Sequence, residues 1–244
     1  RGVHVSATGD GGNASYVGTD GTITADEYGV LVEAETGGVA SANLSGTIDI
    51  ESLNSTAVVV TSNNKAEFEM SGGSASGVDR AVRLSSTGAG GVTAHMTGGT
   101  LTKTGADPDG AALELGVTDA AATASAVIDS GTITSTQTGI EATAIGGAST
   151  SVEINGGTIT SDNETAVRAW TVSGAGDSAI TMTGGDVSGN TGLLAYQTSG
   201  ATGDVSVDLS GGTVSAVDYG VHAYSYAGAG NASASISGDA EITT

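Results

Sequence analysis

The stretch SGTITSTQTGIEATAIGGASTSVEINGGTITS, residues 130–161, contains one complete copy of a pattern that runs through the whole chain. It begins and ends near Gly-Thr-Ile-Thr, and the central apolar residues Ile133 and Ile159 are 26 positions apart. Between them, apolar residues alternate with polar ones in segments 139–142 and 151–154. Alternation with a period of two is typical of strands whose side chains point alternately inward and outward. The stretch therefore predicts three short strands per repeat.

The repeat recurs nine times at a mean spacing of about 27 residues. One spacing, of 32 residues, is longer because it contains residues 106–110, which we expect to form a surface insertion. The nine central apolar residues of this first element are Ile23, Ile48, Ala75, Leu101, Ile133, Ile159, Val187, Val214 and Ile242.

Two further elements recur between copies of the first, the second nine times and the third eight times. The second reads small, apolar, any residue, apolar, and its nine copies begin at Gly2, Gly29, Ala57, Ala81, Ala112, Gly139, Ala166, Gly192 and Gly220. The third ends at a glycine corner and carries inward pairs at Ala42/Leu44, Phe68/Met70, Ala94/Met96, Ala126/Ile128, Val152/Ile154, Ile180/Met182, Val207/Leu209 and Ala234/Ile236.

Three strands per repeat, with glycine corners and no helical periodicity, predict an all-β fold: a single-stranded parallel β-helix, also called a β-solenoid, of about nine coils. Coils of about 27 residues exceed the 18 residues of a hexapeptide left-handed helix, so we expect the right-handed form. We expect residues 1–244 to be one domain and a segment of a longer chain. A narrow apolar cylinder also explains why only 3% of residues are aromatic.

The charge of the chain restricts its partners. Six Lys and Arg against 27 Asp and Glu give a net charge of −21, which excludes a basic patch for nucleic acid or for an anionic membrane. No apolar run is long enough to insert into a bilayer. The absence of cysteine suits a chain that stays unfolded during export.

The glycine corners of the first element share one motif, Ser/Thr/Asn-Gly-(Gly)-Thr-apolar, in Ser45-Gly46-Thr47-Ile48, Thr97-Gly98-Gly99-Thr100-Leu101, Ser130-Gly131-Thr132-Ile133, Asn155-Gly156-Gly157-Thr158-Ile159 and Ser210-Gly211-Gly212-Thr213-Val214. These motifs, together with the Gly-rich, Ser/Thr-rich and cysteine-free composition, resemble those of pertactin-like autotransporter passenger domains and related secreted bacterial β-helix adhesins. The resemblance implies a secreted or cell-surface, extracellular segment used for adhesion, aggregation or as the stalk of a surface filament.

We therefore expect a structural or adhesive segment without catalytic residues, cofactor or metal. Its partners would be glycans or proteins of a host or neighbouring cell, or other copies of the chain. The strand order at Arg1 and Thr244 would allow copies to stack head to tail. Two alternatives stay open: a carbohydrate-active β-helix enzyme, and an ice-binding solenoid.

The enzymatic alternative rests on the outward positions of the second element. From the first coil to the last these positions form a ladder of His4, Leu31, Val59, Arg83, Glu114, Glu141, Arg168, Leu194 and His222. Glu114 and Glu141 would lie about 4.8 Å apart on neighbouring coils, near the carboxyl separation of a retaining glycosidase. The other reading is a charge ladder in which Arg83 and Arg168 neutralise the pair.

The remaining candidate groups are isolated. His4 and His222 are eight coils apart and His95 belongs to another face, so no two histidines are expected to share a metal or a proton. The sequence Asp107-Pro108-Asp109-Gly110 could hold calcium through two carboxylates, but it also has the residues of a simple turn.

The ice-binding alternative rests on a hydroxyl array along the first element. Its outward pairs are Thr22/Thr24, Thr47/Asp49, Ser74/Ser76, Thr100/Thr102, Thr132/Thr134, Thr158/Thr160, Asp186/Ser188, Thr213/Ser215 and Glu241/Thr243. Regular Thr-x-Thr ladders resemble the ice-binding faces of solenoid antifreeze proteins. Threonine is also favoured on any solvated sheet, and the acidic residues interrupt the array.

Overall fold

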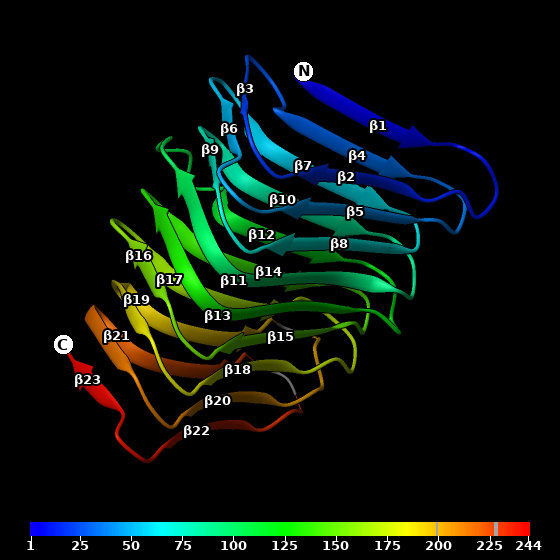
Figure 1. The fold of residues 1–244 in the computed structure, drawn as a ribbon. Coiled ribbons are helices and arrows are strands. Elements are labelled where there is room, and N and C mark those ends of the chain that lie inside the picture. Colours follow the sequence, from blue (N-terminus) through cyan, green and yellow to red (C-terminus); the bar gives the residue numbers. More distant parts are fainter. Residues whose placement is uncertain (199, 227–228) are drawn as a thin grey trace.

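The chain forms a parallel β-solenoid of about nine coils with about 27 residues each, and no helix interrupts the stack in the described residues. The computed structural model describes residues 1–198, 200–226 and 229–244. In Figure 1 the coils stack along one axis, with the N-terminus at one end and the C-terminus at the other. Each coil contributes one strand to each of three faces, which we call A, B and C.

Face A consists of the second elements of the repeat. It contains β1 (Val3–Ala7), β4 (Val30–Ala34), β7 (Thr56–Ser62), β10 (Arg80–Ser86), β12 (Ala111–Val117), β14 (Thr138–Ala144), β17 (Thr165–Thr171) and the second halves of β19 (Asp186–Gln197) and β21 (Thr213–Ser225).

Faces B and C complete each coil. Face B contains β2 (Ala14–Gly18), β5 (Val39–Leu44), β8 (Lys65–Met70), the first halves of β11 (Gly91–Lys103) and β13 (Thr123–Ser135), β15 (Ser149–Ile154), β18 (Ser178–Met182), β20 (Val205–Leu209) and β22 (Ala232–Ile236). Face C contains β3 (Thr22–Ala25), β6 (Asp49–Ser52), β9 (Ser74–Gly77), the ends of β11 and β13, β16 (Thr158–Ser161), the starts of β19 and β21, and β23 (Glu241–Thr243).

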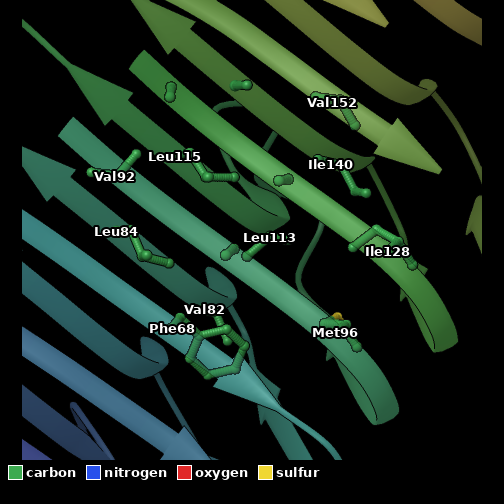
Figure 2. Close-up of a cluster of buried hydrophobic side chains, with 14 of the residues drawn as sticks. Phe68, Val82, Leu84, Val92, Met96, Leu113, Leu115, Ile128, Ile140 and Val152 are labelled. Carbon is green, nitrogen blue, oxygen red and sulfur yellow. The ribbon is translucent and has the colours of Figure 1, made fainter. Parts of the chain in front are cut away.

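The core is a continuous column of small and branched apolar side chains inside the three faces. Phe68, Leu113 and Ile140 are at most 1% exposed, and Figure 2 shows them in one cluster with residues of neighbouring coils. Burying a Val, Leu or Ile side chain contributes about 1.5–3 kcal/mol. Because each such residue stacks on its equivalent one coil away, the core depends on every coil keeping its register.

Glycine is required at the corners between faces B and C. Gly157 and Gly212 have φ angles of 84° and 85°, a left-handed conformation that other residues adopt only with strain. A Cβ atom at Gly212 would also lie 2.5 Å from the carbonyl oxygen of Gly185 in the previous coil. The corner thus explains the Gly-Gly pairs of the repeat.

The expected ladder of face A is confirmed at all nine positions, from His4 to His222. Seven of the eight inward pairs expected on face B are confirmed as buried. The eighth, Ala234/Ile236, stacks on Val207/Leu209 as expected, but it belongs to the last coil and is exposed. The structure adds β2, in which Tyr16 pairs with Ala42 and Gly18 with Leu44. Residues 106–109 are exposed, as expected of an insertion.

The predicted register of one face C strand, β6, was wrong. The residue that stacks on Ile23 and Ala75 is Ile50, not Ile48, so the outward pair of the second coil is Asp49/Glu51 in place of Thr47/Asp49. Ile48 and Ile50 are both buried and two residues apart, so alternation with a period of two cannot distinguish them. Backbone hydrogen bonds decide the register, since the amide of Asp49 donates to the carbonyl of Gly21.

Candidate functional site

The central part of face A carries the ionic ladder that the sequence predicts. Arg83, Glu114, Glu141 and Arg168 occupy equivalent positions on β10, β12, β14 and β17, four successive coils. The Nε atom of Arg83 lies 3.3 Å from Oε1 of Glu114, and Arg168 forms an ion pair with Glu141. Arg80, at the start of β10, also binds Glu114. Each carboxylate of the pair is therefore bound by arginine.

The ion pairs of this ladder are partly shielded from solvent. The side chains of Glu114 and Glu141 are 17% and 14% exposed. Burial on its own lowers the pKa of the Arg168 guanidinium, but the neighbouring Glu141 carboxylate outweighs it, and the pKa is raised. The arrangement matches the charge ladder in which arginine neutralises each carboxylate.

An aromatic column continues face A beyond the ionic ladder, and the sequence analysis missed it. Trp170 and Tyr196 stack with ring centroids 5.2 Å apart and planes 20° apart, and Tyr224 occupies the equivalent position on the next coil. Arg168 lies 6.0 Å from the centroid of the Trp170 ring. Burial raises the pKa of Tyr196 to about 12. Reading every outward position of face A would have found these three rings.

The three histidines lie at separate places. Nε2 of His4 is 2.7 Å from Oε2 of Glu33, and His222 contacts Tyr219 and Tyr224 through its ring. His95 lies on face B, where its Nε2 is 2.8 Å from Oδ2 of Asp129.

Asp129 is also bound by the next coil. Hydrogen bonds from His95 and from Nδ2 of Asn155, the latter 2.9 Å long, lower the pKa of the Asp129 carboxyl. A hollow of about 250 Å³ lies beside His95 and is lined also by Asn43, Glu69 and Ser71. Two sets of side-chain hydrogen bonds thus link successive coils of face B, one between Asn43 and Glu69 and one that joins His95, Asp129 and Asn155.

The insertion at residues 106–110 is a turn that the buried Lys103 side chain binds through hydrogen bonds. The amide of Asp109 donates to Oδ1 of Asp107 over 3.0 Å, the hydrogen bond of an Asx turn. Nζ of Lys103 donates to the carbonyl oxygens of Gly105 and Asp107 at 2.6 and 3.0 Å. Lys103 is only 1% exposed, and burial lowers its pKa. Across the described residues, no three His, Asp or Glu side chains are placed to hold a metal ion.

Face C presents the hydroxyl array with the corrected register. Ser74/Ser76, Thr100/Thr102, Thr132/Thr134 and Thr158/Thr160 stack on four successive coils. The acidic pair Asp49/Glu51 precedes these coils, and Asp186 follows them. The array is therefore continuous over four coils and is bordered by carboxylates at both ends.

No family model, no curated protein and no solved structure matches this chain. Within the described ranges, no helix has the length and apolar character needed to cross a membrane.

Proposed function

We propose that the chain is a non-catalytic structural and adhesive segment of a secreted or cell-surface bacterial protein, arranged like the passenger domain of a pertactin-like autotransporter. The observation that carries the proposal is the stack of about nine coils in which each strand pairs in parallel with its equivalent. At about 4.8 Å per coil, such a stack is a rod about 40 Å long. A rod of this kind presents its outward side chains at fixed spacing and at a distance from the cell surface to which it is attached.

The outward side chains support the same function. On face A, carboxylates pair with arginine or histidine between coils, as Glu141 does with Arg168 and Glu33 with His4. Ion pairs of this kind fix the orientation of the outward side chains on face A. The net charge of −21 opposes the close approach of copies at low ionic strength and disfavours nucleic acid as a partner.

A bead assay tests the adhesive part of the proposal. Beads coated with the purified chain are mixed with epithelial cells and with bacterial cells, and the bound beads are counted. The matched control is Ile140→Asp, which places a carboxylate in the core and opens the stack. We expect wild-type beads to bind at least one cell type and control beads to bind neither. Equal binding by both kinds of bead, or no binding, would contradict the proposal.

Ice binding is a second candidate because the Ser/Thr pairs of face C stack over four successive coils. If this face binds ice, the chain will show thermal hysteresis, and Thr132→Tyr will abolish it by interrupting the array. Our first proposal predicts no hysteresis above that of an unrelated acidic protein.

A further inference from the structure

Face A has a hollow over the first coils of the stack, where the ionic ladder begins at Arg83. Its volume is about 270 Å³, close to the lower end of the range for small-molecule pockets, about 300 Å³. Leu31 and Val59 line it from successive positions of the His4 ladder. Leu31 is only 4% exposed although its ladder faces outward. Neighbouring side chains therefore already cover Leu31, and Val59, which is half-buried, provides the apolar surface of the hollow.

Two of the chain's six Lys and Arg residues, Arg1 and Arg83, line this hollow. In the described part of the chain, the acidic contact of Arg83 is with Glu114, at 3.3 Å, and 49% of its side chain is exposed. Glu114 is held more closely by Arg80. The two guanidinium groups thus bind different oxygens of one carboxylate, Arg80 at Oε2 and Arg83 at Oε1. Arg83 can accept a second carboxylate from a ligand, and arginine binds carboxylates with strong, charge-assisted hydrogen bonds.

The opposite side of the hollow is polar. Glu33, Thr61 and Ser85 occupy the second outward position of face A on three successive coils, and all three line the hollow. Ser85 donates to Oγ1 of Thr61 over 3.1 Å. Hydroxyl and carboxylate oxygens accept hydrogen bonds from the hydroxyls of a polyol. Tyr28, with Arg1 5.9 Å from its ring centroid, also borders the hollow and adds an aromatic surface.

We propose that this hollow binds one sugar unit that carries a carboxylate, a uronic acid of an extracellular polysaccharide. The carboxylate binds Arg83, with Arg1 nearby, and the apolar face of the ring packs on Val59. The sugar hydroxyls donate to Glu33, Thr61 and Ser85. A uronic acid fits better than an acidic peptide because the hollow combines an apolar floor with several hydroxyl-binding oxygens. The inference rests on the proposed adhesive function and names the ligand class.

A matched pair of ligands tests the site. Methyl α-galacturonoside and methyl α-galactoside differ in the carboxylate, so their binding is compared by NMR titration of the isotopically labelled chain. We expect the galacturonoside to bind at least about tenfold more tightly, because only the acid engages arginine. Signals from Val59, Thr61 and Ser85 should shift. Equal affinity for the two sugars would overturn the proposal.

Variants locate the interaction. Arg83→Ala should weaken galacturonoside binding at least about tenfold, and Arg83→Lys should restore part of the affinity. The Arg83→Ala variant should fold, since Arg80 still binds Glu114. Lys65→Ala is the control, because Lys65 is a partly exposed cation on face B, away from the hollow. If Arg83→Ala binds the galacturonoside as tightly as the wild type, the hollow is not the binding site.

The remaining outcomes separate this inference from the function on which it rests. If an aspartate-containing tetrapeptide binds as tightly as the galacturonoside, the hollow recognises acidic peptides and the saccharide proposal is wrong. If Arg83→Ala beads bind cells normally while the galacturonoside does not bind, the adhesive function stands and the hollow is not its ligand site. If wild-type beads do not bind cells but the galacturonoside binds through Arg83, the hollow stands without cell adhesion.

Discussion

Glu141 and Arg168 are direct neighbours on β14 and β17, and their side chains form an ion pair that is mostly shielded from solvent. The guanidinium also lies beside the Trp170 ring. One residue thus links the ionic ladder of face A to its aromatic column.

Removing one partner of this pair should destabilise the chain more than removing both. Arg168→Ala leaves the mostly buried Glu141 carboxylate without its arginine partner, and we expect it to lower the free energy of unfolding by about 1–3 kcal/mol. Adding Glu141→Gln to Arg168→Ala should recover part of that loss. Urea denaturation of both single variants and the double variant measures the coupling. Strictly additive effects would show that the pair contributes nothing.

Inward and outward positions should differ sharply in their tolerance of charge. Ile140 is fully buried, so Ile140→Asp should lower the free energy of unfolding by several kcal/mol, on the order of 3–5 kcal/mol. Thr134 is on the outward side of face C, and Thr134→Asp should change stability by less than about 1 kcal/mol. Thermal melts compare the two variants. Equal melting temperatures would mean that the assignment of inward and outward positions is wrong.

Two glycines provide a matched test of the corners. Gly212→Ala should lower the free energy of unfolding by about 1–2 kcal/mol, because φ is 85° and the new Cβ would meet the backbone of the previous coil. Gly116→Ala, in β12, meets no atom within 4 Å and should be neutral or stabilise by about 0.5 kcal/mol. Chemical denaturation distinguishes them, and a neutral Gly212→Ala would contradict the corner geometry.

The Asp129 carboxyl should titrate below its ordinary pKa of 3.8, because His95 and Asn155 hydrogen-bond to it. Its contribution to stability is therefore present above the unfolded pKa and is lost as pH falls through the lower folded pKa. NMR titration of the Asp129 side-chain carboxyl carbon measures the value directly. Replacing His95 with Ala should raise this pKa toward 3.8. An unchanged pKa in that variant would show that the contact is absent in solution.

The sequence predicted the repeat well because a strand that stacks on its own equivalent leaves a fixed signature. Each face A strand follows a small residue and keeps apolar residues at its inward positions, so every rung from His4 to His222 was placed correctly. The prediction failed where two possible registers differ by two residues, as at Ile48 and Ile50, because both registers place apolar side chains inward.

Contacts away from the ladder were harder to predict. Arg80 reaches Glu114 from outside the ladder, and Lys103 is buried because the insertion folds back over it. Neither contact has a signature in the spacing of residues. The hollow lined by Leu31 and Arg83 also needs the structure, because Tyr28 and Arg1 reach it from the corner before face A.

The most direct test of the account is whether the chain cleaves polysaccharides. The purified chain is incubated with a panel of neutral and acidic polysaccharides, and reducing ends and unsaturated uronates are measured over time. The account predicts no product above the buffer control, because Arg80 and Arg83 bind Glu114, and Arg168 binds Glu141. Product that is released by the wild type and abolished by Glu114→Gln or Glu141→Gln would contradict it and identify the chain as an enzyme.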